Sequence, residues 1–369
     1  MTGASGVDVV CVGESMVTFV PTTPGRLADV SAFARTIGGA ESNVACALAA
    51  AGHRVKWVGR VGADAFGDHL VEAIGGWGVD TTAVARDPDR QTGVYFRAAT
   101  DRADGGHEVL YYRAGSAASA MSPETVPWGV VEGGRMLHVS GITAALSDGC
   151  GALMHQLVAP RPGRPLVSFD VNYRAGLWRG GRAAVLLELA RAADVVFVGE
   201  DEAEEAWGLR GADAIREALP EPGVLVVKRG GRGAVAYERD SARREGAAWG
   251  EAQRSGPAPG SAARTTVPAP APDTVTAAPA PHVTVVAPVG AGDAFAAGFL
   301  SGTLRGLTVA ERIRHGHLMA AAALTTPHDL AAPPSRAHAD RLVALSDDAW
   351  GRLRLGPGWT GEDLEVRTS

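Results

Sequence analysis

Cysteine is scarce in this chain of 369 residues, which carries it only at Cys11, Cys46 and Cys150. So small and odd a number does not make a disulfide framework, and it fits a reducing compartment such as the cytoplasm. The sequence also has no uninterrupted apolar run of about 18 residues, the length that a membrane-spanning helix needs. The start, up to Asp8, lacks the basic segment of a signal peptide. We therefore expect a cytoplasmic protein that does not act at a membrane.

Positive charge is also in short supply, since 35 Lys and Arg face 41 Asp and Glu, for a net charge of −6. This balance argues against a partner as densely anionic as nucleic acid. It leaves room for a small anion, which a local cluster of arginines can bind. Hydrophobic residues make up 46% of the chain, so a sizeable globular core is expected.

Short apolar runs alternate with helical stretches along most of the chain, the pattern of a parallel sheet with flanking helices. The runs that read as buried strands lie at 9–12, 55–58, 136–139, 166–169, 195–198 and 224–227. Two β-rich segments, 92–98 and 109–113, differ because only a polar turn separates them. We predict that they form a hairpin that projects from the main sheet.

Proline marks a break in composition, because seven of the 22 prolines fall within residues 241–281. The stretch mixes them with Ala, Ser, Thr and Gly, so it has little apolar surface to bury against the entropy of ordering. We predict an irregular, mobile insertion here.

A glycine-rich turn, Gly290-Ala291-Gly292-Asp293, follows the apolar run 283–286 and precedes an alanine-rich stretch. A strand, a tight turn and a helix N-terminus together suit a phosphate, because backbone N–H groups converge there. A carboxylate beside that site needs a purpose, and a general base that deprotonates an attacking hydroxyl is one. A simple N-capping role for Asp293 is the equally weighted alternative.

A second motif places Gly38 and Gly39 before an alanine-rich helix, with Asn43 inside it. The glycines would let a ligand approach the backbone, and the amide of Asn43 could bind sugar hydroxyls. An ordinary helix start is the alternative.

Together the two motifs resemble the N- and C-terminal signatures of the ribokinase-like, or PfkB, carbohydrate kinases. The resemblance implies an α/β fold, with a doubly wound, mostly parallel sheet flanked by helices and a small β-sheet lid. It places this kinase domain at 1–330, with lid strands near 16–36 and 92–113, and leaves 331–369 as a C-terminal extension. It makes Asp293 the catalytic base within the turn of Gly290, Ala291 and Gly292, and implies ATP and Mg2+ as cofactors. A homo-oligomer through the lid also fits the resemblance.

Further motifs are similar to those of 2-keto-3-deoxygluconate kinases. They are Tyr111-Tyr112-Arg113, His138 to Ile142, and Asn172-Tyr173-Arg174. An acid sugar needs a cation, and the arginine fork matches a carboxylate. The substrate residues implied by the resemblance are Gly38, Gly39, Asn43, Tyr95, Tyr111, Arg113, Ile142 and Arg174. We expect a neutral sugar to leave Arg113 and Arg174 without a partner.

The resemblance assigns the nucleotide to Asn172, Lys228, Gly230, Gly233, Gly290 and Gly292, and assigns magnesium, through water, to Glu202. Two departures bear on the metals: Gly199 stands where the family has Asn, and Ala287 stands where it often has an acidic residue. The predicted function is ATP-dependent phosphorylation of the terminal hydroxyl of a sugar, chiefly 2-keto-3-deoxygluconate. The alternatives are a kinase of a neutral sugar such as fructose or ribose, and a non-catalytic sugar-binding relative. A dinucleotide-binding dehydrogenase is disfavoured, because Gly13-Glu14-Ser15-Met16 replaces G-x-G-x-x-G after the first strand.

Overall fold

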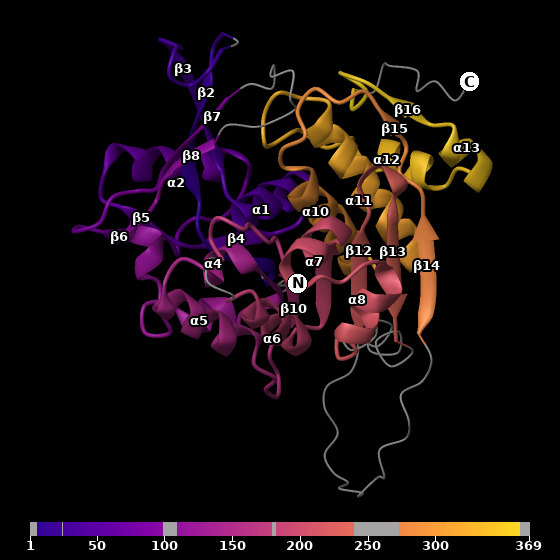
Figure 1. The fold of residues 1–369 in the computed structure, drawn as a ribbon, viewed down its shortest axis with the longest axis horizontal. Helices are drawn as coiled ribbons and strands as arrows, with labels where there is room; N and C mark the ends of the chain where they lie inside the picture. The colour runs from indigo at the N-terminus through magenta and orange to yellow at the C-terminus, as the bar shows by residue number, and fades with distance from the viewer. Residues whose placement is uncertain (1–5, 24, 99–108, 179–181, 240–272, 362–369) are drawn as a thin grey trace, which may run out of the picture.

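An eight-stranded sheet runs through the molecule and organises the rest (Figure 1). The computed structural model describes residues 6–23, 25–98, 109–178, 182–239 and 273–361. Along the sheet the strand order is β14-β13-β12-β11-β10-β9-β1-β4. The six strands from β12 to β4 are parallel, whereas β13 and β14 pair antiparallel at one edge. The strands are β1 (Val7–Val12), β4 (Val55–Val58), β9 (Gly134–Ser140), β10 (Leu166–Asp170), β11 (Val195–Gly199), β12 (Val224–Lys228), β13 (Ala234–Glu238) and β14 (Thr274–Ala278).

Helices cover both faces of this sheet, and its central strands are apolar on both sides as a consequence. In β1, for example, Val9 and Cys11 pack into one core and Val10 and Val12 into the other. One core includes α5 (Asp148–Val158) and α6 (Ala184–Ala192), and the other includes α1 (Ala40–Ala50), α2 (Ala65–Gly76), α10 (Ala291–Leu304) and α11 (Val309–Leu324). The shorter helices are α3 (Trp128–Val131), α4 (Gly141–Ala144), α7 (Glu200–Trp207), α8 (Ala212–Ala218), α12 (Arg336–Val343) and α13 (Asp347–Gly351), with 3-10 turns η1 (Ala117–Ala120) and η2 (Gly230–Arg232). The predicted α/β fold with a mostly parallel sheet is confirmed.

A separate four-stranded sheet stands to one side of the main sheet, at the upper left of Figure 1. Its order is β3 (Phe33–Gly38), β2 (Met16–Pro21), β7 (Val94–Arg97) and β8 (Val109–Tyr112). The antiparallel pairing of β7 with β8 confirms the predicted hairpin. Phe19 and Phe96 stack across β2 and β7 at 4.9 Å between ring centroids. A two-stranded pair, β5 (Arg60–Gly62) with β6 (Ala85–Asp87), lies nearby in the chain.

The predicted insertion 241–281 extends too far at its C-terminal end. Residues 274–278 form the edge strand β14, whose five residues pair with β13. Just before it, the carboxylate of Asp273 accepts two hydrogen bonds from Arg216, each 2.7 Å long. Pairing with a strand edge satisfies the backbone of β14 without a strong apolar signal in its sequence, and for this reason composition alone misses it. Residues 241–272 lie outside the described part of the chain.

Two further segments near the C-terminus differ in detail from expectation. The predicted strand 283–286 is reduced to β15 (His282–Val283), which pairs outside the main sheet with β16 (Arg354–Leu355). The described part of the C-terminal extension, up to residue 361, forms α12, α13 and β16, and these pack against α11 around a third apolar core. Within the described residues, no helix has the length and apolar character needed to cross a bilayer.

The antiparallel register between β13 and β14 generates a prediction about the insertion. Glu238 pairs with Thr274, so the described residues that flank the stretch 241–271 lie beside each other. Replacing that stretch with a four-residue turn should leave the melting temperature unchanged or slightly higher. The expected gain in unfolding free energy is about 1 kcal/mol, because a shorter loop costs less entropy to close. Thermal unfolding and sugar-kinase activity measure the outcome.

A deletion extended through Ala278 is the control, since it also removes β14. We expect that variant to be destabilised, because it leaves the edge of β13 unpaired. Unfolding of the shorter deletion would contradict the prediction.

Candidate active site

The candidate site lies at the edge of the main sheet where the parallel strands end, the usual ligand position in such folds. Glu14 follows β1, Asn172 follows β10, and Lys228 ends β12. The N-terminus of α10 brings Gly290 to Asp293 to the same place, where these residues share a cavity of about 210 Å³ with Asn172 and Lys228. Arg174 and Glu202 line this cavity as well, so side chains distant in sequence meet here.

Asp293, in the first turn of α10, is held by two amides. It accepts hydrogen bonds from Asn43 Nδ2 at 2.9 Å and Asn172 Nδ2 at 3.3 Å. Burial raises the pKa of Asp293 to about 6, and the charge of Asp170 adds to that rise. The Asn43 hydrogen bond acts in the opposite direction. A carboxyl group with this pKa is largely deprotonated at neutral pH yet can take up a proton, as a general base must.

The turn before Asp293 requires glycine for a measurable reason. Gly290 has φ of 73°, in the left-handed region, and a Cβ there would collide with the backbone oxygen of Asp329. After it, Ala291 and Gly292 begin α10, whose first N–H groups have no partner within the helix. Lys228 Nζ is near enough that a Cβ on Gly292 would lie 3.6 Å from it. Helix N-terminus and lysine together make a site for an anion.

Lys228 is fixed by a buried carboxylate, because its Nζ donates to both oxygens of Asp170 at 3.0 Å. Burial favours the neutral amine, but the charges of Asp170 and Glu202 outweigh it and raise the pKa of Lys228. The ammonium therefore stays charged at the mouth of the turn.

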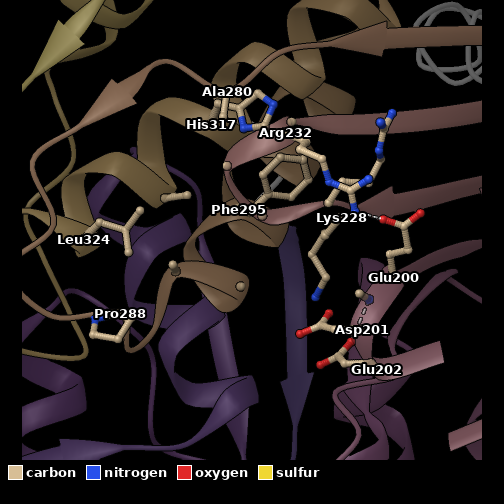
Figure 2. A pocket seen from close by; sticks show the side chains of 18 of the residues that line it. Glu200, Asp201, Glu202, Lys228, Arg232, Ala280, Pro288, Phe295, His317 and Leu324 are labelled. Carbon is tan, nitrogen blue, oxygen red and sulfur yellow. Dashed lines mark hydrogen bonds and ion pairs between the residues drawn. The ribbon is translucent and has the colours of Figure 1, made fainter. Parts of the chain in front are cut away.

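A larger cavity of about 880 Å³ adjoins this turn and has the size of a nucleotide site (Figure 2). In the figure, His317, Phe295 and Ala280 lie at one end of the cavity and the Asp201 and Glu202 carboxylates at the other. Of the residues expected to bind nucleotide, Lys228, Gly230, Gly233 and Gly292 line it. The remaining two, Asn172 and Gly290, line the smaller cavity next to it.

Glu202 lies in the first turn of α7 and caps its N-terminus, accepting a hydrogen bond from the backbone N–H of Gly199 at 2.7 Å. Its other oxygen lies 3.4 Å from Arg174 Nη1. The described residues contain no group of three or more acidic, His or Cys side chains placed to hold a metal directly.

The glycines of the N-terminal motif pack against protein atoms. A Cβ on Gly38 would collide with Tyr95 Oη, and one on Gly39 with the backbone oxygen of Glu14. They allow the start of α1 to sit close to the end of β1, which places Asn43 beside Asp293. Close packing therefore requires glycine at both positions, and contact of a ligand with their backbone stays a prediction.

Buried Glu41 fixes the same helix start from the other side. It accepts hydrogen bonds from Ser140 Oγ at 2.8 Å and Thr143 Oγ1 at 2.7 Å. Burial raises its pKa to about 7 in spite of these donors.

Some residues expected on the sugar side are buried and have protein partners, and others are half exposed. Tyr95 donates from its hydroxyl to Asp329 Oδ2 at 2.6 Å, and its ring lies 5.5 Å from that of the half-exposed Tyr111. Arg113 is buried and paired with Glu14, whose other oxygen accepts from Ser116 Oγ at 3.0 Å. Ile142, in α4, is partly buried and precedes Thr143, which accepts from the backbone N–H of Glu14 at 3.3 Å.

Arg174 differs from Arg113 in being half exposed, at 52%, and in having a looser ion pair, with Glu202 at 3.4 Å. It also donates to its neighbour's backbone oxygen at 2.7 Å. Both arginines thus have a carboxylate partner. The expectation that a neutral sugar would leave them unpaired is wrong for this structure, because Glu14 and Glu202 already neutralise them.

Four residues without an assigned role in the sequence analysis have clear partners here. Glu14 and Asp170 follow or end predicted strands, so the rule that ligands gather at carboxyl ends of parallel strands could have found them. Arg97 and Asp329 form a buried ion pair at 2.9 Å. Nothing in the local sequence signals this pair, because it joins β7 to the loop after α11 across 232 positions.

Comparison with known proteins agrees with this geometry. The sequence profile of the pfkB family carbohydrate kinases matches residues 7–252 and 265–336. A 2-dehydro-3-deoxygluconokinase of Bacillus subtilis is 31% identical over 89% of this chain and 93% of its own length. A probable chloroplastic fructokinase of Arabidopsis thaliana is 28% identical over 85% of this chain and 75% of its own.

Among solved structures, a PfkB protein from Polaromonas sp. JS666 superimposes with a TM-score of 0.73 at 28% identity. The match covers 90% of this chain and 99% of the other. The family profile spans most of the chain and includes both motifs, Gly38 to Asn43 and Gly290 to Asp293. The chain therefore belongs to the pfkB family of carbohydrate kinases, and it is a sugar kinase.

Proposed function

We propose that this kinase transfers the γ-phosphoryl group of ATP to the terminal hydroxyl of an acid sugar, 2-keto-3-deoxygluconate. The observation that carries the proposal is the shared cavity of Asp293 and Arg174. A base and a half-exposed guanidinium beside one anion-binding helix N-terminus suit a substrate with a hydroxyl at one end and a carboxylate at the other. The similarity to 2-dehydro-3-deoxygluconokinase supports the same substrate.

Asp293 is the general base in this proposal. Its carboxylate takes the proton of the terminal hydroxyl as that oxygen attacks phosphorus, and the leaving oxygen remains on ADP. Asn43 and Asn172 hold the carboxylate in place through their amide N–H groups. Their own carbonyl oxygens are buried with no hydrogen-bond donor among the described residues. These oxygens are free to accept from substrate hydroxyls.

The backbone N–H groups of the turn and the Lys228 ammonium stabilise negative charge on the phosphates. Magnesium, when bound, would neutralise charge on the phosphate oxygens, held through water by Glu202. The other acidic side chains that line the larger cavity would add negative charge near that cation.

The substrate carboxylate is assigned to Arg174. Arg113 and Tyr111 are placed on the other side of the sugar, next to the small sheet. Arg174 can turn from Glu202 to the substrate because its ion pair is long and half exposed, and such pairs contribute little. Arg113 is less free, being buried against Glu14. Its role is to keep a net neutral, hydrogen-bonded wall beside the sugar.

Phosphorylation of a neutral sugar is the second candidate, favoured by the fructokinase relative and by the pairing of both arginines. In either case, self-association through the small sheet is part of the proposal. Its edge strand β8 exposes Leu110, Tyr111 and Tyr112.

Substrate selectivity is the direct test. With ATP and Mg2+, kcat/KM for 2-keto-3-deoxygluconate should exceed that for fructose or ribose by about 10- to 100-fold, the worth of one charge-assisted hydrogen bond. Arg174→Ala should remove most of that preference. Arg182→Ala, which removes another exposed arginine, serves as the control and should leave it intact. Equal kcat/KM for fructose would instead identify a neutral-sugar kinase.

Replacing the base separates catalysis from binding. Asp293→Asn keeps the shape and a polar side chain but removes the proton acceptor, so kcat should fall by about 10²-fold or more. Sugar affinity, measured by calorimetry, should change little. The control is Asp148→Asn, which alters an almost fully exposed acidic residue in the first turn of α5. Near-normal turnover in folded Asp293→Asn would leave Asp293 a helix-capping role alone.

The pH dependence follows from the raised pKa. The base acts when deprotonated, so kcat should be flat at neutral pH and decline below about pH 6, where Asp293 takes up a proton. The residual activity of Asp293→Asn should not show this decline. An acid limb that persists in that variant would assign the titration to another group.

A further inference from the structure

One wall of the larger cavity is a short connection between β14 and α10. Residues that line the cavity from this connection are Ala280, Pro281, Val283, Val285 and Pro288. The connection is largely irregular, with only the two residues of β15 in a strand. Its position must therefore come from what holds its backbone.

Hydrogen bonds to the C-terminal segment, residues 336–361, hold it. Trp350 donates from Nε1 to the Pro279 oxygen at 2.8 Å. The backbone N–H groups of His282 and Thr284 donate to Leu353 and Leu355, each at 2.9 Å. Each of these bonds joins the cavity wall to residues that do not themselves line the cavity.

The C-terminal segment is a firm support because it is anchored in its own core. Trp350 and Leu353 are fully buried, and Leu355 nearly so, in the apolar cluster formed with α11. The Arg314 guanidinium lies 4.9 Å from the Trp350 ring and donates to the backbone oxygens of Val343 and Leu345. Other residues of α11, among them His317, line the cavity. The segment and the cavity thus share one helix.

We propose that the C-terminal segment is a positioning element of the nucleotide site, acting chiefly through Trp350. The family profile ends at residue 336, so this segment lies beyond the part that defines the family. The inference rests on the proposed binding of ATP in the larger cavity. Trp350 touches no substrate in this proposal: it fixes the backbone at Pro279, and with it the wall against which the nucleotide packs.

The test compares two tryptophans of the same core. Trp350→Phe keeps an aromatic ring but removes the hydrogen bond to Pro279. Trp359→Phe is the matched control, because Trp359 is 4% exposed and its Nε1 has no hydrogen-bond partner among the described residues. Trp350→Phe should raise KM for ATP about three- to tenfold, the scale of one lost hydrogen bond. KM for the sugar and kcat at saturating ATP should stay within about twofold of the unmodified enzyme, since Asp293 is untouched.

Direct binding of ADP by calorimetry gives a readout that does not need the sugar to be known. Its affinity should weaken by the same factor in Trp350→Phe and not in Trp359→Phe. Hydrogen exchange of the His282 and Thr284 amides should be faster in Trp350→Phe and slower when ADP is bound. Together these results would separate nucleotide positioning from general loss of stability.

Equal ADP affinity in the two variants, with both folded, would overturn the inference and leave the proposed kinase reaction standing. A parallel loss of sugar affinity or of kcat would also overturn it, because the effect would then be structural. Failure of the unmodified protein to bind ADP would overturn the proposed function and this inference together.

Discussion

A buried carboxylate at the start of a helix is the constraint on which the site depends. In the proposed reaction Asp293 must keep a negative charge close to a phosphate group, and burial opposes that charge. The amides of Asn43 and Asn172 stabilise the ionised carboxylate by donating hydrogen bonds to it. Because these amides are uncharged, they lower its pKa less than a cation in the same place would. Asn43 belongs to α1 and Asn172 to the loop after β10. The packing of both elements against α10 therefore positions the proposed base.

The cost of burying a charge also explains two ion pairs near the site. Lys228 is held by Asp170, and Arg113 by Glu14, in pairs whose carboxylates are almost fully buried. A lone charge at either place would be costly, whereas a pair keeps its geometry with little net charge. The loosely paired Arg174 is therefore the cation most available to a ligand.

Much of the fold was predictable from sequence because its signals are local. Buried strands such as β1 and β11 are apolar on both faces. The turn before Asp293 requires glycine at Gly290, and this requirement is visible in the sequence. The strand β14 was not predictable, since its stability comes from pairing with β13 rather than from its own residues. Within the candidate site, Asn172, Arg174 and Lys228 line one cavity with the glycine turn, whereas Arg113 and Tyr111 do not line it. The partners of Arg113 and Arg174 were missed, because an ion pair between positions about 100 or 28 apart leaves no mark in sequence.

The hairpin of β13 and β14 has a consequence for how this chain can be re-engineered. Glu238 pairs with both Val224 and Thr274, so the connection from β13 to β14 lies at the end of the sheet where β12 begins. Lys228 and the site lie at the opposite end, where β12 ends. A sequence inserted between Glu238 and Thr274 would therefore leave the sheet at the end opposite the site. This makes the junction a natural place for new chain termini by circular permutation, or for a grafted fluorescent domain that reports on the enzyme without blocking its substrates.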